Sequence, residues 1–109
     1  MKIGLDIMSG DNAPLSNING AIKYINNPLS KDNEIVLYGN ENIIKNNTTL
    51  LKKYKQRISH IYTTKIVNMN DSPSSAFKNK RNSSLIKIID ELKTNKIDAS
   101  VSSGNTGAL

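Results

Sequence analysis

The stretch KIGLDIMSGDNAP at residues 2–14 decides the fold. Its first six residues, 2–7, place apolar side chains at every second position, which predicts a short buried strand. The residues that follow are typical of a turn, and Pro14 fits the first turn of a helix but cannot continue a strand ladder. A strand, a glycine-bearing loop and a helix in succession form the first unit of a parallel α/β fold.

The rest of the chain repeats this alternation. Further strands are predicted at Glu34–Tyr38, Arg57–Tyr62 and Asp98–Ser102. Helices are predicted from Pro14 to Asn26, after Asn40 with a weak point at residues 46–49, at residues 75–80, and along the apolar stripe of Leu85, Ile88, Ile89 and Leu92. The order predicts the first βαβαβαβ portion of a parallel-sheet, three-layer α/β/α sandwich, with residues 1–109 forming part of one domain.

Composition excludes several classes of protein. The 109 residues contain no cysteine, so disulfide frameworks, thiolate metal sites and cysteine nucleophiles are excluded. The net charge is +6, from 15 basic and 9 acidic residues. Almost all the cations are scattered lysines, and Arg57 and Arg81 are the two arginines. Because nucleic-acid surfaces use arginine heavily, no nucleic-acid partner is expected.

The start of the chain does not resemble a signal peptide, because its apolar stretch is short and Asp6 interrupts it. No apolar run approaches the length needed to cross a bilayer. We therefore expect a cytoplasmic protein, and peripheral membrane contact stays open.

The first loop, residues 8–14, follows a strand and precedes a helix, which is where open parallel sheets bind ligands. Gly10 allows close backbone approach, and the helix start offers N–H groups to a phosphate. Asp6 and Asp11 would repel an anion, so they are better explained as hydrogen-bond acceptors that fix the loop, or as groups that hold a substrate through a cation or water. The alternative is that Asp11 and Asn12 simply form a turn, and the pattern alone slightly favours it.

A second polar loop follows the last predicted strand. Ser103, Gly104, Asn105, Thr106 and Gly107 offer hydroxyl, amide and backbone donors that could surround an anion. An ordinary capped connection explains the same residues equally well. The loop lacks the lysine and the spacing of a Walker motif.

Lys80, Ser83 and Ser84 belong to a basic, hydroxyl-rich segment, residues 78–84, that could supply positive charge to the site. A solvated helix face is the usual meaning of such a run. His60 is the single histidine and is expected to be structural or exposed. The sequence has neither metal-ligand spacing nor a nucleophile elbow, so no metal site is predicted.

Several of these motifs, in this order, resemble those of the acyl-acyl carrier protein:phosphate acyltransferases of bacterial phospholipid synthesis, the PlsX family. The resemblance extends over essentially the whole chain, and its most specific part is Ala99–Leu109. The matching stretches are Ile3–Pro14, Asn68–Pro73, Lys80 with Ser83 and Ser84, and Ala99–Leu109. Ser9, Leu85 and Ser103 depart from the usual glycine, methionine and alanine, and we expect Ser9 to stiffen the first loop.

The resemblance implies an enzyme that makes acyl phosphate from acyl carrier protein thioester and inorganic phosphate, without a cofactor. It implies a fold similar to phosphate acetyltransferase and to the isocitrate and isopropylmalate dehydrogenases. Family members tend to be homodimers, and some associate peripherally with membranes. The implied phosphate-binding residues are Gly10, Asp11, Asn12, Lys80, Ser83, Ser84, Ser103, Gly104, Asn105, Thr106 and Gly107. Lys80 and Asn105 are the candidate catalytic residues, and no residue is assigned as the base.

Family members continue far beyond residue 109. We therefore expect the 109 residues alone to be inactive and aggregation-prone or partly unfolded, because a parallel sheet cut after its fourth strand leaves apolar surface or an edge uncovered. Two alternatives remain open. One is a non-catalytic truncated remnant, and the other is a related phosphate acetyltransferase that uses coenzyme A.

Overall fold

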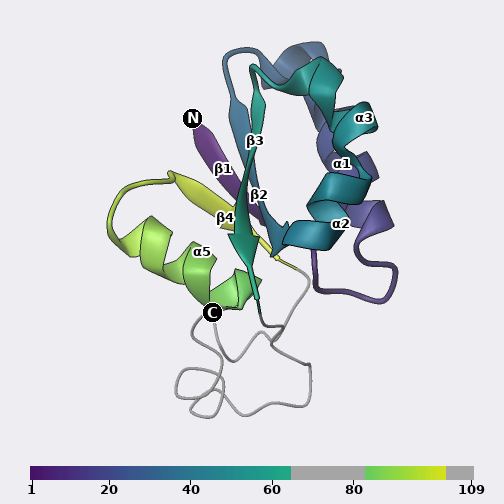
Figure 1. Ribbon diagram of the computed structural model, residues 1–109. Helices are drawn as coiled ribbons and strands as arrows, with labels where there is room; N and C mark the ends of the chain where they lie inside the picture. The colour runs from purple at the N-terminus through teal and green to yellow at the C-terminus, as the bar shows by residue number, and fades with distance from the viewer. Residues whose placement is uncertain (65–82, 103–109) are drawn as a thin grey trace.

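The computed structural model describes residues 1–64 and 83–102, which form a four-stranded parallel sheet between helices (Figure 1). Along the sheet the strands run in the order β3-β2-β1-β4. Their bounds are β1 Lys2–Asp6, β2 Glu34–Asn40, β3 Ile58–Thr63 and β4 Ala99–Val101. The predicted parallel sheet is therefore confirmed.

Helices cover both faces of the sheet, which gives the predicted three layers (Figure 1). One face carries α1, α2 and α3, and the opposite face carries α5. The bounds are α1 Leu15–Ile25, α2 Glu41–Asn46, α3 Thr48–Leu51 and α5 Ser84–Lys93, with short 3-10 turns at Pro28–Ser30 (η1) and Lys52–Tyr54 (η2). The likeness to the dehydrogenase fold stays a prediction.

The order of the strands places a topological switch point between β1 and β4. β1 pairs with β2 on one side and with β4 on the other, so that Ile3 lies opposite both Ile35 and Ala99. The chain builds the sheet outward through β2 and β3, then crosses over to the far side of β1. In open α/β sheets, ligands bind beyond the carboxyl ends of the strands at such a point.

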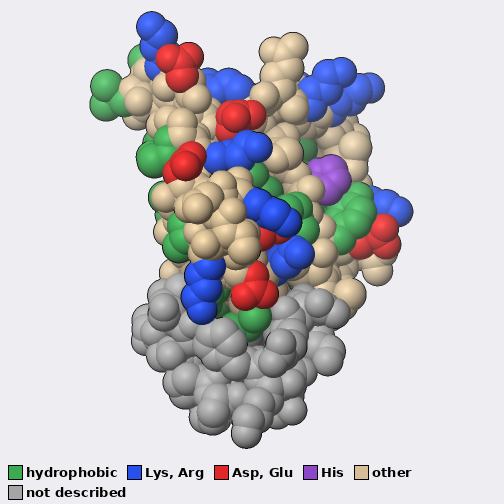
Figure 2. Space-filling model, turned by 90° about the vertical axis from the view of Figure 1, so that its left-hand side faces the viewer, with side chains coloured by type: hydrophobic (Ala, Val, Ile, Leu, Met, Phe, Trp, Pro, Cys, Tyr) green, Lys and Arg blue, Asp and Glu red, His purple; other side chains and the backbone are tan. Residues whose placement is uncertain are grey.

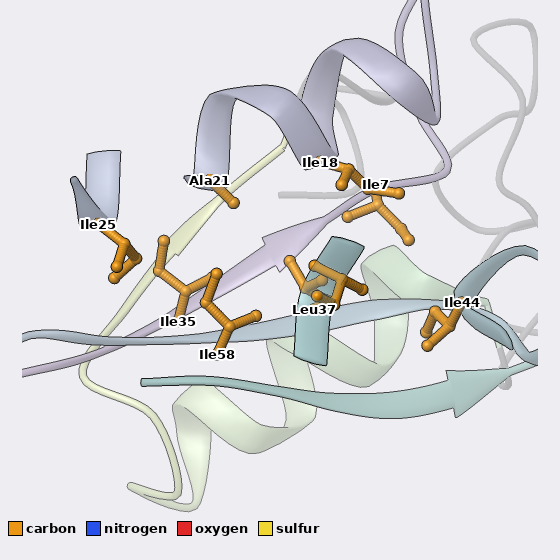
Figure 3. Close-up of a cluster of buried hydrophobic side chains, with 9 residues drawn as sticks. Ile7, Ile18, Ala21, Ile25, Ile35, Leu37, Ile44 and Ile58 are labelled. Atoms are coloured by element: carbon orange, nitrogen blue, oxygen red, sulfur yellow. The ribbon is translucent and has the colours of Figure 1, made fainter. Parts of the chain in front are cut away.

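Alternation along β2 supplies both halves of the core. Ile35 and Leu37 face α1, whereas Val36 and Tyr38 face α5. Ile18, Ala21 and Ile25 of α1 point toward the sheet, where Ile35 and Leu37 lie (Figure 3). The buried cluster on the α1 side contains Ile7, Ile18, Ala21, Ile25, Ile35, Leu37, Ile44, Leu51 and Ile58. A strand with apolar residues on both faces is typical of a buried parallel sheet.

Local signals in the sequence explain where elements begin and end. The Asn40 side chain accepts a hydrogen bond from the Asn42 N–H and caps α2, as predicted. Asn47 separates α2 from α3, at the predicted weak point. The second strand was predicted to end at Tyr38, but β2 continues through Gly39 to Asn40. Glycine suits position 39, because a Cβ there would stand 2.5 Å from Ile7 Cγ1.

A buried polar pair ties α5 to the sheet. The Tyr38 hydroxyl donates a hydrogen bond of 2.6 Å to Glu91 Oε1, and Lys87 Nζ lies 3.6 Å from Glu91 Oε2. Burial, followed by the hydrogen bond and the negative charge of Glu91, raises the pKa of Tyr38 well above its ordinary value of 10.0. The folded state therefore holds the phenol proton more tightly than the unfolded state does.

We expect Tyr38→Phe to lower the free energy of unfolding by about 1–3 kcal/mol near pH 7, since Glu91 loses its buried donor. The raised pKa adds to the free energy of unfolding. This added stability is complete below pH ~10 and is lost as the pH rises further, because the unfolded state then releases the phenol proton of Tyr38 first. The difference between the wild type and Tyr38→Phe should therefore shrink by up to about 1.4 kcal/mol per pH unit above that value. Urea titrations between pH ~7 and ~11 measure it. Tyr62→Phe, at an exposed site, is the control, and an equal response from both variants would contradict the prediction.

Candidate functional site

Asp6 stands at the centre of the switch point, at the carboxyl end of β1, and its side chain is fully buried. Its Oδ1 accepts hydrogen bonds from the Met8 N–H, at 2.9 Å, and from Ser84 Oγ. Its Oδ2 accepts from Ser9 Oγ and, at 3.0 Å, from Ser102 Oγ. Burying a carboxylate is costly unless donors satisfy it, and here neutral donors do so. Among residues 1–64 and 83–102, no cation forms an ion pair with Asp6.

The first loop is held in a defined shape beside this carboxylate. Gly10 adopts a φ of 104°, in the region that favours glycine. The Asn17 side chain, in the first turn of α1, donates to the carbonyls of Ile7, at 3.1 Å, and Ser9, at 2.9 Å. The expectation that Ser9 restricts the loop agrees with its buried hydroxyl, which donates to Asp6.

The loop encloses a polar hollow of about 400 Å³ at the amino end of α1. It is lined by Ser9, Gly10, Asp11, Asn12, Ala13, Ser16 and Asn17. Within the described part of the chain, the N–H groups of Gly10, Asp11 and Asn12 have no backbone acceptor. These donors, with the helix dipole of α1, suit an anion, whereas the Asp11 carboxylate opposes one.

Ser83 and Ser84 lie at the start of α5 and are both buried. The Ser83 side chain accepts a hydrogen bond from the Ile86 N–H at 3.2 Å and caps the helix. The Ser84 hydroxyl donates to Asp6, 78 residues away in the chain. Ser83 therefore caps α5, and Ser84 lies against the end of β1.

The structure places five of the predicted binding residues. Gly10, Asp11 and Asn12 line the polar hollow, Ser83 caps α5, and Ser84 joins the first loop through Asp6. Ser102 brings the end of β4 to the same carboxylate. The other predicted residues, Lys80, Ser103, Gly104, Asn105, Thr106 and Gly107, lie outside the described residues, as does the predicted helix at residues 75–80.

Sequence reasoning recognised Asp6 as an acceptor that fixes the loop, but it did not foresee that three segments share it. A charged residue that ends an apolar strand was the available signal. Asn17 was missed altogether, and its sequence neighbourhood offers no signal, because polar residues are ordinary in a helix. His60, expected to be structural or exposed, is exposed and stacks on Tyr62 with the ring centroids 4.9 Å apart.

A second hollow, of about 330 Å³, is apolar and lies between α1 and the strands β1 and β4. It is lined by Ile3, Leu5, Ser16, Asn17, Gly20, Ala21, Tyr24, Ile35 and Val101. It shares Ser16 and Asn17 with the polar hollow, so the two adjoin.

The face that carries α5 has side chains of both charges. On the face that carries α5, cationic and anionic side chains alternate, with no large area of one sign (Figure 2). Within residues 1–64 and 83–102, no helix is long and apolar enough to cross a membrane.

A family model and individual relatives both match this chain over its full length. The family described as "Fatty acid synthesis protein" matches residues 1–109. A "Phosphate acyltransferase" of Dictyoglomus thermophilum is 40% identical over 112 residues, which cover 100% of this chain and 32% of that protein. Proteins of the same name from Halalkalibacterium halodurans and Bacillus subtilis are 39% and 36% identical, with 100% of this chain and 31% of each relative covered.

The chain therefore spans about a third of the length of these relatives. The resemblance noted from the sequence motifs is confirmed at the level of the family. Since the match extends over every residue, the chain belongs to the fatty acid synthesis protein family.

Proposed function

We propose that this chain forms the amino-terminal part of a phosphate acyltransferase, which makes acyl phosphate from acyl-acyl carrier protein and inorganic phosphate in phospholipid synthesis. The observation that carries the proposal is the match of the whole chain to relatives named "Phosphate acyltransferase". Acyl carrier protein and phosphate are the proposed partners. The homodimer, the cytoplasmic location and peripheral membrane contact implied by the sequence resemblance stay predictions.

The proposed reaction joins one phosphate oxygen to the thioester carbonyl carbon and then breaks the carbon–sulfur bond. The carrier thiol leaves with the electron pair and takes up a proton. Because phosphate already carries nucleophilic oxygens, no covalent enzyme intermediate is needed. The protein must hold phosphate beside the thioester and stabilise the charge that develops on the carbonyl oxygen. Lys80 and Asn105 are the residues we propose for that stabilisation.

The described geometry supports a phosphate position at the first loop. The ends of β1 and β4 meet at Asp6, and the polar hollow opens beside them. The backbone N–H groups of residues 10–12 and the start of α1 are the donors there. Donors from residues 103–107 would complete the site in the proposed arrangement.

Gly10→Ala should weaken phosphate binding, and Gly20→Ala is its matched control. Alanine at position 10 strains a φ of 104° and changes the shape of the loop. Gly20 lies in α1, and a Cβ there meets no atom within 4 Å. We expect Gly10→Ala to cost about 1–2 kcal/mol of stability and to raise the Kd for inorganic phosphate about tenfold. We expect Gly20→Ala to gain about 0.5–1 kcal/mol with the Kd unchanged.

The measurements are urea unfolding and phosphate titration of a chimera that joins residues 1–109, labelled with ¹⁵N, to the remaining two thirds of the Dictyoglomus thermophilum enzyme. The titration is followed by the backbone amide signals. If Gly10→Ala left the phosphate affinity at the wild-type value, the first loop would not be the phosphate site.

The activity itself is tested by a chimera that joins residues 1–109 to the remaining two thirds of the Dictyoglomus thermophilum enzyme. The expected result is acyl phosphate formation from an acyl carrier protein thioester, lost on Asn105→Ala, with none from the 109 residues alone. A preference for coenzyme A thioesters would support the acetyltransferase alternative. Failure of the chimera where the intact enzyme is active would support the truncated remnant.

A further inference from the structure

The Asp6 carboxylate has no free acceptor position. A carboxylate offers about four lone-pair sites, and four donors reach Asp6: the Met8 N–H and the hydroxyls of Ser9, Ser84 and Ser102. The side chain is also fully buried. Asp6 therefore cannot take a proton from a substrate, and it acts on the site only through the groups that it holds.

The four donors come from three segments far apart in the chain. Met8 and Ser9 belong to the first loop, Ser84 begins α5, and Ser102 follows β4. The hydrogen bonds to Ser84 and Ser102 join residues 78 and 96 positions from Asp6. One carboxylate thus fixes how these three segments lie relative to one another at the switch point.

The same bonds set the direction of the hydroxyl protons. An ionised carboxylate only accepts, so each serine must turn its proton toward Asp6. The hydroxyl lone pairs then face away from Asp6. Ser9 also lines the polar hollow, and because its hydroxyl proton is donated to Asp6, that proton is not available to an anion there.

We propose that Asp6 is a positioning residue, which clamps the three segments together and keeps the proton of Ser9 turned away from the polar hollow. This inference rests on the proposed function, because it takes phosphate as the ligand of that hollow. Under this proposal, the backbone N–H groups of the first loop hold phosphate, and the serine hydroxyls do not. The buried Asp6 carboxylate fixes the geometry of that loop.

Asp6→Asn tests the proposal, because it keeps the size of the side chain and replaces one of its two acceptor oxygens with an NH₂ donor. The asparagine oxygen can replace Oδ1 and accept from Met8 and Ser84. Its NH₂ group replaces Oδ2 and donates to Ser9 and Ser102, whose hydroxyls rotate to accept. The protons of Ser9 and Ser102 then point away from residue 6, and one negative charge beside the hollow is lost.

In a chimera of residues 1–109 with the remaining two thirds of the Dictyoglomus thermophilum enzyme, ¹⁵N-labelled over residues 1–109, we expect Asp6→Asn to shift amide signals in all three segments together and to tighten phosphate binding about tenfold. A purely structural role would weaken binding, if it changed binding at all. Asp90→Asn, on the exposed side of α5, removes the same charge and should change neither measurement. Shifts confined to the first loop, or phosphate affinity that is equal or weaker in a folded Asp6→Asn, would overturn the proposal.

Ser102→Ala provides a second test if Asp6→Asn does not fold. It removes one donor from β4 and should still move signals of the first loop and of Ser84, through the shared carboxylate. Shifts restricted to β4 would contradict the clamp. If the wild type does not bind phosphate, the phosphate site fails, whereas the joint movement of the three segments still decides whether Asp6 positions them.

Discussion

Leu37→Ala is expected to lower the free energy of unfolding by about 3 kcal/mol. Leu37 is fully buried at the middle of β2, where it packs in the cluster beneath α1 (Figure 3). Removing its three outer carbons loses their transfer free energy and leaves a cavity that fixed neighbours on both sides cannot fill. With a urea dependence typical of a small domain, the unfolding midpoint should fall by about 2 M.

Leu29→Ala is the matched control, because Leu29 is 89% exposed in η1. Its effect should stay within about 0.5 kcal/mol, as at other surface sites. If the two variants were equally stable, residues 1–64 would not form the packed core seen beneath α1.

The second large effect is expected at Arg57, just before β3. Its guanidinium donates to the carbonyls of Ile25 at 3.3 Å, Ser30 at 2.6 Å and Asn33 at 3.1 Å, and also to Ser30 Oγ at 3.0 Å. The carbonyls come from the end of α1, from η1 and from the residue just before β2. Arg57→Met keeps the apolar stem and removes every donor, which should cost about 2–3 kcal/mol.

Arg57→Lys separates geometry from charge. An ammonium group has the same charge but cannot reach three carbonyls as a planar fork does. Its stability in urea should therefore lie between those of wild type and Arg57→Met, with exposed Lys55→Met close to wild type. A lysine variant as stable as the wild type would show that the charge alone matters.

The sequence pattern predicted much of the fold because local signals and burial agree. The apolar run in Glu34–Tyr38 predicted a strand that the structure confirms, and the helix predicted after Asn40 begins there, with Asn40 as its cap. The error at Gly39 has a tertiary cause. Glycine usually ends a strand, but here Ile7 crosses so closely that only glycine can continue it.

The candidate site was predicted less completely, since its contacts join distant parts of the chain. The loop around Gly10 has a local signature, because turn residues and a helix start lie together in sequence. The bonds from Ser84 and Ser102 to Asp6 depend on the strand order, which places β4 beside β1. No local sequence pattern indicates that β4 pairs with β1.

The position of β1 inside the sheet has a consequence during translation. This strand is synthesised before the other three, yet one of its two edges has no partner until β4 is complete, 95 residues after the end of β1 at residue 6. At about 5–20 residues per second, that edge stays open for roughly 5–19 s. A nascent chain would thus expose a strand edge able to pair with other unfolded chains, and chaperones at the ribosome exit would have their substrate there.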